Sequence, residues 1–548
     1  MSDLLRMTGM YSGMDTESIV SQLVKTKSTK VTNLKNEQKK LEWKQTAWQD
    51  LNSKIYNMYS KTLSNLRLTS AYSKKSTVSS DSTKATVVAS EGAVNGTQTL
   101  QVNKLAKSGY LTGAKLDGKT TTTTGTDGKD VTKVVNWETT DKLSEIDSNL
   151  TGKTISLTTG TGTDTKTTDI EITADMTIND LVAKFKDAGV NASFDTTNQR
   201  FFINSTGTGS AKNFTLSSDD STALASLGLD PNATYTDING SKNSCVKIEG
   251  QDAEIVLNGA TFTSDSNTFS INGLTINTLG VTDEEISIVT STDYDGIYNT
   301  IKDFLTEYND LINEMDKLYN ADSARKYDML TDDQKESMTD DEVEQWEDKI
   351  KSALLRKDNS LYNVMNTLTT TMMDGYYENN LSDKQKKNMS ASEISAWYKE
   401  NGGKKHYLSD YGIGTLSYFE AQDNEHHAYH INGDADDEFT STKEDKLKAA
   451  IAEDPEGTAN FFATLCKTLY SKLDETMSES TEYSSIYKVY NDKQLKKDYK
   501  DYTTKISDAE DELNDYEDRW YNKFSKMEVA LSKLQSQTSS ISSMLGSN

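Results

Sequence analysis

The four histidines are the residues of this sequence whose type and spacing could hold a metal ion. They are His406, His426, His427 and His430. His426 and His430 have an i,i+4 spacing, which on a helix would direct both imidazoles to one side and could ligate zinc. Tyr429 and the Asn432-Gly433 pair instead favour a strand and a turn, where this spacing has no such consequence. We therefore predict no metal site at these histidines.

An acidic stretch follows them, because residues 432–438 read Asn-Gly-Asp-Ala-Asp-Asp-Glu. An EF-hand calcium loop needs a glycine at its sixth position and a glutamate at its twelfth, and the stretch has neither at that spacing. We interpret it as an acid-rich turn. Cys245 and Cys466 are the two cysteines, and they lie far apart in the chain. They predict neither a zinc motif nor a disulfide framework.

The common catalytic motifs are missing from the sequence. It contains no Gly-x-Ser-x-Gly turn, no phosphate-binding P-loop and no Gly-x-Gly-x-x-Gly nucleotide fingerprint. Its carboxylates are numerous, and none stands in a recognisably apolar stretch that would single out a catalytic pair. We predict a protein that is not an enzyme, needs no cofactor, and acts through its shape and assembly.

Charge and composition exclude several classes of partner. The 548 residues include 59 Lys and Arg against 85 Asp and Glu, a net charge of −26 at pH 7. Nucleic acid and anionic membranes attract basic surfaces, so neither is expected as a partner. The apolar fraction of 34% lies below the roughly 45–50% of ordinary globular chains. We expect an elongated chain, or one that completes its burial with partner chains, in about three to four structural units.

Targeting signals are also missing. No apolar run reaches the roughly 18 residues that a membrane-spanning helix needs, so we expect no membrane insertion. The first ten residues lack the basic segment and the following apolar segment of a cleaved secretory signal. Near-absence of cysteine agrees with the cytosol or with export by a route without disulfide chemistry.

Both chain ends predict long helices with a coiled-coil seam. Residues 17–70 carry an apolar position every seven residues, with a polar row beside it. The apolar positions are Leu34, Leu41, Trp48 and Ile55, and the polar row is Gln38, Gln45 and Asn52. An amphipathic helix lying on a globular core is the alternative interpretation of this segment.

At the other end, residues 495–545 carry apolar positions at alternating steps of four and three. Two successive steps of four at Tyr516, Trp520 and Phe524 form a stutter, which locally unwinds a supercoil. An unbroken helix of this length would extend about 75 Å. The two terminal helices can pair antiparallel, which predicts a stalk that presents the middle of the chain as a head.

Residues 75–290 predict antiparallel β-structure, because helical periodicity vanishes and Thr, Ser, Gly and Asn dominate. Short alternating runs occur at residues 86–88, 99–102, 154–157 and 200–203. We expect hairpin turns at Asn272-Gly273 and Asp117-Gly118. The threonine-rich stretches 120–124 and 158–168 are expected to be exposed hairpin edges.

Helical periodicity interrupts this region once and returns after it. A helix over residues 177–188 would have one apolar face, made of Ile178, Leu181, Val182 and Phe185. From Tyr294 onwards a strong amphipathic face appears, made of Ile297, Ile301, Phe304, Leu305, Tyr308, Leu311, Ile312 and Met315.

An internal repeat follows. The segment from Leu381 to Trp397 resembles the segment from Leu330 to Trp346, which lies 51 residues earlier in the chain. Each copy has two capping-box spacings, which are Thr331/Gln334 with Thr339/Glu342 and Ser382/Gln385 with Ser390/Glu393. Each copy therefore predicts two short capped helices with a structural role.

Five stretches together resemble one known family. Residues 9–24 read Gly-Met-Tyr-Ser-Gly-Met-Asp-Thr-Glu-Ser-Ile-Val-Ser-Gln-Leu-Val. This is similar to the opening of the flagellar filament cap family, FliD or hook-associated protein 2, in which a Gly-x-x-Ser-Gly-hydrophobic-Asp turn precedes a helix. The other stretches are 92–106, 250–276, 301–312 and 446–462, in the order that the family has.

The resemblance implies an α+β multidomain protein, with long terminal coiled-coil helices forming a stalk and antiparallel β head modules. Terminal leg segments, disordered or coiled coil, are expected at 1–40 and 515–548. A helical stalk domain with inserted helices and a short hairpin is expected at 41–75 and 291–514. The first β head module would comprise 76–110 and 246–290, and the second 111–245. We predict that the leg segments are disordered in the free monomer and become ordered on assembly.

The resemblance also implies a function in cell motility. Such a protein would form a ring-shaped homo-oligomer at the distal tip of the extracellular bacterial flagellum, promote flagellin insertion and polymerisation, and prevent subunit loss. Its partners would be itself, flagellin, hook-associated proteins and a cytoplasmic export chaperone. Export would use the flagellar type III apparatus without a cleaved signal peptide. The expected assembly interface of the terminal helices is Ile19, Leu23, Leu34, Leu41, Leu513, Trp520, Phe524, Leu531 and Leu534.

Two other functions stay open. A hook–filament junction protein or flagellin-like structural subunit shares helical ends and the β-motif, but lacks the Gly-Ser-Gly-Asp opening. A surface adhesin would use the threonine-rich 111–245 segment for cell adhesion by binding host glycans. A carboxylate-pair hydrolase is disfavoured because nothing in the sequence selects a pair.

Overall fold

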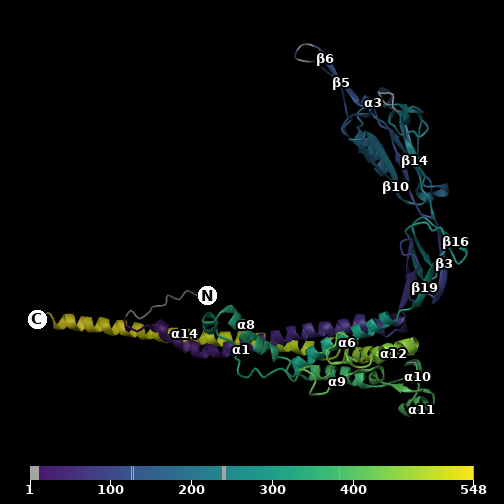
Figure 1. Ribbon diagram of the computed structural model, residues 1–548. Coiled ribbons are helices and arrows are strands. Elements are labelled where there is room, and N and C mark those ends of the chain that lie inside the picture. The colour runs from purple at the N-terminus through teal and green to yellow at the C-terminus, as the bar shows by residue number, and fades with distance from the viewer. Residues whose placement is uncertain are drawn as a thin grey trace. The chain divides into compact units, whose positions relative to one another are not determined.

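The computed structural model describes residues 11–546, except 125, 127–128, 237–241, 380 and 382. The chain divides into two compact units (Figure 1). The helical unit contains the residues up to Tyr72 and those from Tyr294 onwards, and the β-unit is Ser73–Asp293. Two separate segments of the sequence therefore build the helical unit, with the β-unit inserted between them.

The two longest helices of the helical unit come from opposite ends of the chain. They are α1, Thr16–Asn57, and α14, Asp492–Leu545. The Asp15 side chain caps α1 by accepting a 3.0 Å hydrogen bond from the Ser18 amide. After Asn57 the chain continues through a π-helical turn, Met58–Leu63, into α2, Ser64–Leu66. The predicted helix at 17–70 is thus confirmed in its main part, with one widened turn.

The same two helices lie side by side and run antiparallel, as the purple and yellow helices in Figure 1 show. Lys30 forms an ion pair of 2.8 Å with Glu512, and Lys35 forms one of 2.6 Å with Glu510. Residue numbers rise along α1 as they fall along α14. The predicted antiparallel pairing of the termini is therefore confirmed.

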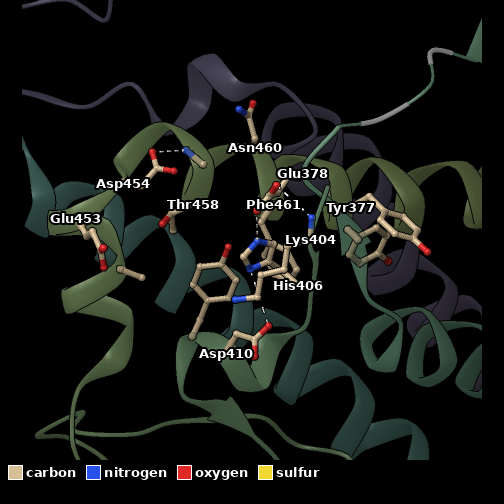
Figure 2. A pocket seen from close by; sticks show the side chains of 14 residues that line it. Tyr377, Glu378, Lys404, His406, Asp410, Glu453, Asp454, Thr458, Asn460 and Phe461 are labelled. Atoms are coloured by element: carbon tan, nitrogen blue, oxygen red, sulfur yellow. Dashed lines mark hydrogen bonds and ion pairs between the residues drawn. The ribbon is translucent and has the colours of Figure 1, made fainter. Parts of the chain in front are cut away.

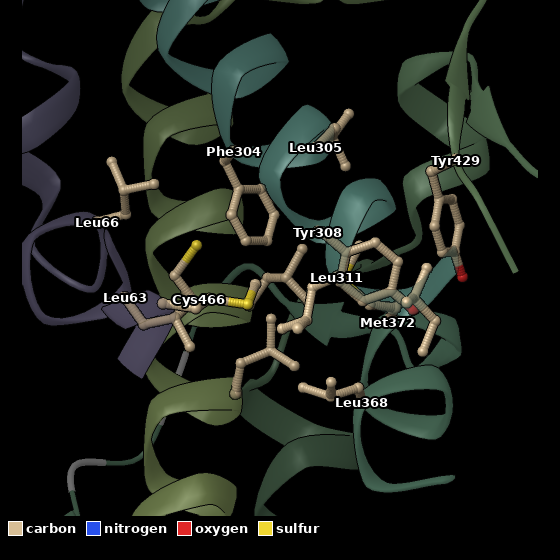
Figure 3. Packing of buried hydrophobic residues seen from close by; sticks show 14 of the residues in the cluster. Leu63, Leu66, Phe304, Leu305, Tyr308, Leu311, Leu368, Met372, Tyr429 and Cys466 are labelled. Carbon is tan, nitrogen blue, oxygen red and sulfur yellow. The ribbon is translucent and has the colours of Figure 1, made fainter. Parts of the chain in front are cut away.

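One hydrophobic core holds the rest of the helical unit together. Its principal helices are α6 (Tyr294–Tyr319), α9 (Asn359–Met373), α12 (Lys446–Glu453) and α13 (Pro455–Met477). They pack with the last turns of α1 and with α2, and Figure 3 shows Leu63, Phe304 and Cys466 meeting in this core. All eight apolar residues predicted for the helix after Tyr294 are buried. Their single apolar face explains why α6 lies at the centre.

Both copies of the internal repeat form short helices. They are α7 (Asp332–Glu336) with α8 (Asp340–Ser352), and α10 (Asp383–Lys386) with α11 (Ala391–Asn401). The capping boxes that begin at Thr331, Thr339 and Ser390 are confirmed. The one predicted at Ser382 lies outside the described residues. The helical unit also contains two small two-stranded antiparallel sheets, β20 (Tyr376–Tyr377) with β21 (Lys405–His406) and β22 (Ile413–Gly414) with β23 (His430–Ile431).

The β-unit has two hydrophobic cores, and the first lies between two antiparallel sheets. A five-stranded sheet has the order β1-β19-β3-β15-β16, and a three-stranded sheet has the order β17-β18-β2. The strands are β1 (Lys75–Ser79), β2 (Ala85–Ala89), β3 (Gly96–Lys104), β15 (Ala253–Leu257), β16 (Ala260–Ser264), β17 (Thr268–Ile271), β18 (Leu274–Thr278) and β19 (Ile286–Thr292). Alternate residues such as Leu100, Val102 and Ile276 fill the core, because successive strand residues face opposite sides.

The second core contains a four-stranded sheet of order β14-β4-β10-β9 and a three-stranded sheet of order β11-β7-β8. Its elements are β4 (Ser108–Thr112), β7 (Thr154–Thr159), β8 (Lys166–Glu171), β9 (Val190–Asp195), β10 (Arg200–Thr208), β11 (Phe214–Ser218), β14 (Val246–Ile248), α3 (Leu143–Ile146), α4 (Ile178–Asp187) and α5 (Ala223–Ser226). The four residues predicted for the apolar face of α4 are all buried. Two ribbons accompany the sheets, β5 (Lys119–Thr124) with β6 (Asp130–Val135) and β12 (Tyr235–Thr236) with β13 (Lys242–Asn243).

One of the two predicted hairpin turns is wrong. Asn272-Gly273 joins β17 to β18 with positive φ at both residues, which fits a type I′ turn. Asp117-Gly118 instead connects β4 to β5, which belong to different sheets, so it closes no hairpin. Asn258-Gly259, which is not among the predicted turns, joins β15 to β16 with positive φ at both residues.

Candidate assembly interface

The pair of α1 and α14 changes character along its length. At the end nearer the core, Trp48 is 1% exposed and its ring stacks on Tyr490 at 5.0 Å, just before α14 begins. Asn52 is also buried, and its side chain bonds the Tyr487 carbonyl and the Val489 amide at 3.1 and 3.0 Å. This inner end is therefore fixed by burial as well as by hydrogen bonds.

Further from the core, mainly exposed polar contacts join the two helices. The ion pairs from Lys30 and Lys35 have side chains that are about half exposed or more. Gln38 Nε2 donates to Thr503 Oγ1 at 2.7 Å, and Lys27 Nζ lies 5.7 Å from the Tyr516 ring centroid. Exposed ion pairs of this kind contribute about 0–1 kcal/mol each. These exposed polar contacts therefore contribute little to the pairing of the outer half.

None of the nine predicted interface residues is fully buried. Ile19 is 38% exposed and Leu534 is 58% exposed. The other seven are partly buried, and they are Leu23, Leu34, Leu41, Leu513, Trp520, Phe524 and Leu531. Apolar side chains therefore line the outer rod without a complete cover from this chain.

The antiparallel pairing brings four of these nine residues into one stretch. Ile19 and Leu23 on α1, and Trp520 and Phe524 on α14, all lie on the outer side of the contact between Lys27 and Tyr516. Leu34 and Leu513 lie near the two ion pairs, while Leu41 lies nearer the core. Leu531 and Leu534 belong to the last turns of α14, which extend past the start of α1 in Figure 1.

The stutter on α14 forms a row of aromatic rings. Ring centroids of Tyr516 and Trp520 are 6.2 Å apart, and those of Trp520 and Phe524 are 6.0 Å apart. Lys523 Nζ lies 4.4 Å from the Trp520 ring centroid, within cation–π range. Large, partly exposed aromatic side chains of this kind are typical anchors of protein–protein interfaces.

Two family models match this chain and decide its affiliation. The flagellar hook-associated protein 2 N-terminus matches residues 12–109, and the flagellar hook-associated protein 2 C-terminus matches residues 250–536. The chain belongs to the flagellar hook-associated protein 2 family. The matched ranges include most of both long helices and the whole first core of the β-unit.

Several individual proteins are similar to this chain. Flagellar hook-associated protein 2 of Halalkalibacterium halodurans is 24% identical, over 98% of this chain and 99% of that protein. Flagellar hook-associated protein 2 of Thermotoga maritima is 26% identical, over 69% of this chain and 53% of that protein. The crystal structure of the flagellar cap protein FliD D1-D2-D3 domains from Escherichia coli aligns with a TM-score of 0.49 and 20% identity, over 82% of this chain and 99% of that chain.

The buried seam of the hook-associated protein 2 helices includes residues absent from the predicted interface. Val20 is 1% exposed, and Val31, Ile506 and Ala509 are buried as well. Extending the row of Leu34, Gln38 and Leu41 backwards in steps of three and four reaches Val31 and Val20, so the signal was present. Ile19 lies one position away from that row, which explains its greater exposure.

A cavity of about 550 Å³ lies elsewhere in the helical unit (Figure 2). His406 Nε2 and Glu378 Oε1 share a hydrogen bond of 3.0 Å in it, which holds the pKa of Glu378 below its ordinary value. Asp410 Oδ2 lies 3.9 Å from His406 Nδ1. These groups join β20, β21 and the turn after them, so we assign them a structural role.

His426 and His430 have different surroundings. His426 lies in a turn and stacks on Tyr418 at 4.7 Å, while His430 lies in β23. The predicted strand and turn are therefore confirmed. His430 Nδ1 and Asp437 Oδ2 share a hydrogen bond of 2.7 Å, which ties the acidic turn to the hairpin. Across the part of the chain that the structure describes, no group of three or more His, Cys, Asp or Glu residues could hold a metal ion.

Among the described helices, none combines the length and the apolar composition that crossing a membrane requires. Most positions of α1 and α14 are polar, and Lys and Glu recur along both.

Proposed function

We propose that this protein is a cap of the flagellar filament. It acts as an oligomer at the distal tip, where it promotes the insertion and polymerisation of flagellin subunits and prevents their loss. Membership of the flagellar hook-associated protein 2 family supports this role. The observation that carries the proposal is the rod of α1 and α14, whose outer half leaves apolar residues incompletely covered.

Burial of these side chains would supply the free energy of docking. Apolar surface removed from water contributes roughly 25 cal/mol per Å², and large aromatic residues such as Trp520 and Phe524 dominate such interfaces. In this proposal, neighbouring subunits at the filament end complete the cover that the monomer lacks. Residues 1–40 and 515–548 are the leg segments that dock there, and their described parts lie in α1, in the turn before it and in α14. Residues 1–10 and 547–548 lie outside the described part of the chain.

Further partners follow from the proposed role. The protein would assemble with copies of itself in a ring, contact flagellin and the other hook-associated proteins, and meet an export chaperone in the cytoplasm before secretion. Export through the flagellar type III apparatus would need no cleaved signal peptide. The functional location would then be the extracellular tip of the flagellum.

Electron microscopy of flagellin filaments mixed with the purified full-length chain tests the proposal. Additional density confined to filament tips is the expected result. A variant carrying Leu531→Ser and Leu534→Ser should lose tip binding, because it removes apolar surface near the end of α14 while leaving the core unchanged. Ser536→Ala with Ser540→Ala is a matched pair of changes on the same exposed turns, and it should keep tip binding.

Density distributed along filament sides, or none at all, would contradict the cap function. If the doubly substituted Leu531 and Leu534 variant still bound tips as the unchanged protein does, the cap could stand, but its docking surface would lie elsewhere.

A further inference from the structure

The turn before α1 is bound by a single side chain of α14. The Tyr11 amide donates to Glu528 Oε2 at 2.9 Å, and the Ser12 amide donates to the same oxygen at 3.3 Å. The Ser12 hydroxyl donates to Glu528 Oε1. One carboxylate therefore receives three hydrogen bonds from two consecutive residues near the opposite end of the chain.

The surroundings of Glu528 differ from those of its neighbours. Glu528 is 1% exposed, whereas Val529, the next residue, is 47% exposed. A buried carboxylate is unfavourable unless its oxygens are hydrogen-bonded. Here both oxygens have donors, and the bond from Ser12 is the main reason that the pKa of Glu528 lies below its ordinary value. The charged form of the carboxylate is thus the one that fits this position.

The turn also connects this contact directly to the start of α1. Gly13 has φ of +65°, a conformation that favours glycine. The Met14 amide donates to Ser12 Oγ at 3.3 Å, and Asp15 then caps the helix through the Ser18 amide. A chain of local hydrogen bonds therefore links the residues held by Glu528 to the first turn of α1.

We infer that Glu528 is a positioning residue that holds the Tyr11–Ser12 turn on α14 and thereby fixes the outer end of α1. With this end fixed, Ile19 and Leu23 stay beside the aromatic row of α14, so that both helices present one continuous apolar surface. The expected effect of Glu528 on capping rests on the proposed function. The contact itself is a property of the monomer.

Hydrogen–deuterium exchange of the full-length chain, at labelling times from milliseconds to seconds, tests the contact directly. In Glu528→Ala, the Tyr11 and Ser12 amides should exchange about tenfold faster than in the unchanged protein, since they lose a charged acceptor. Glu528→Gln keeps one carbonyl oxygen as an acceptor and should give an intermediate rate. Asp518→Asn, an exposed carboxylate on the same helix, is the matched control and should leave both rates unchanged.

A second variant separates positioning from general damage to α14. Ser12→Ala removes one donor without touching α14, and it should also accelerate exchange at Tyr11 and Ser12. Far-UV circular dichroism should be the same for all variants. Equal exchange rates in the unchanged protein and in Glu528→Ala would overturn the inference, as would acceleration spread evenly over the whole of α14.

Filament-tip binding provides the functional readout. Glu528→Ala should reduce the fraction of capped tips, and Glu528→Gln should restore part of it, in the same order as the exchange rates. Loss of capping without any change in exchange would overturn the inference, because Glu528 would then act on a partner. If the unchanged protein caps no filaments, the proposed function fails, while the exchange experiment still decides whether the contact exists.

Discussion

Replacing Asn52 by alanine should destabilise the helical unit strongly. From the sequence alone, Asn52 belongs to the polar row beside the apolar seam of α1, where such a replacement would be expected to cost little. Asn52 is 3% exposed, and its amide group bonds both the Tyr487 carbonyl and the Val489 amide. These backbone groups belong to the loop between α13 and α14. Leaving a buried donor or acceptor without a partner costs about 1–3 kcal/mol. With two such groups affected, we expect a loss of about 2–4 kcal/mol in the free energy of unfolding.

Gln38 provides the matched control, since it occupies the same polar row of α1. Its side chain bonds Thr503 and the Tyr499 carbonyl in an exposed setting, where water can replace the lost contacts. Gln38→Ala should therefore cost less than about 1 kcal/mol. Asn52→Leu tests the cause, because leucine fills the space but offers no polar atoms. It should be no more stable than Asn52→Ala.

Urea unfolding followed by ellipticity at 222 nm measures these differences. The described helices of the β-unit are short, so this signal reports chiefly on the helical unit. The reasoning would be refuted if Asn52→Ala and Gln38→Ala lost the same stability. It would also be refuted if Asn52→Leu unfolded at the same urea concentration as the unchanged protein.

Three further predictions concern other parts of the chain. Gly273→Ala should lower the melting temperature of the β-unit, measured by calorimetry, more than Gly259→Ala does. Both glycines have φ of +80°, so alanine is strained at either position, but only at Gly273 would the added Cβ also meet other atoms at 3.0 Å. Burial alone would raise the pKa of Asp492, but the hydrogen bonds from Ser485 together with the ion pair to Lys496 outweigh it and keep that pKa below its ordinary value. The resulting stability is present above about pH 4 and is lost as the pH falls through the folded-state pKa; Asp492→Asn should remove this part of the pH dependence in acid titration of the unfolding free energy. Burial raises the pKa of the Cys466 thiol to about 12, so a thiol reagent at pH 8 should modify Cys466 only after denaturation, as mass spectrometry would show.

Periodicity in the sequence predicted the long elements well, because a helix that buries one face needs apolar residues at regular steps. The residues assigned to the face of α6 are all buried, and so are those assigned to α4. The buried seam between α1 and α14 also contains Val20, which lies outside the predicted interface although the three–four steps that join Leu41, Gln38 and Leu34 lead to it.

Turn dipeptides show the limit of local signals. Asp117-Gly118 and Asn258-Gly259 have similar turn propensity, yet only the second closes a hairpin. A dipeptide favours a reversal of the chain but does not determine which strands pair on either side. In this protein β4 pairs with β10 and β14, whereas β5 pairs with β6. The outcome therefore depends on contacts between residues far apart in the chain.

The same limit applies to the polar contacts that fix the helix pair. Glu528 and Asn52 are ordinary polar positions on amphipathic helices when the sequence alone is considered. Their roles arise because each meets a backbone segment from a remote part of the chain, Tyr11–Ser12 in one case and the Tyr487–Val489 loop in the other. Local periodicity carries no information about these encounters.

Different kinds of contact hold the two ends of the α1–α14 pair. At the inner end, Trp48 and Asn52 are buried, so opening there exposes apolar surface and breaks buried hydrogen bonds. At the outer end, exposed ion pairs such as Lys30–Glu512 contribute little, so the pairing there depends on buried Val20 and on the hydrogen bonds of Glu528. With α1 held in this way, partner chains at the filament tip can cover the apolar row of α14 while the core stays folded. A seam made more apolar by Gln38→Leu should strengthen the pairing within the monomer and keep docking at the filament tip, and loss of tip binding in this variant would contradict the reasoning.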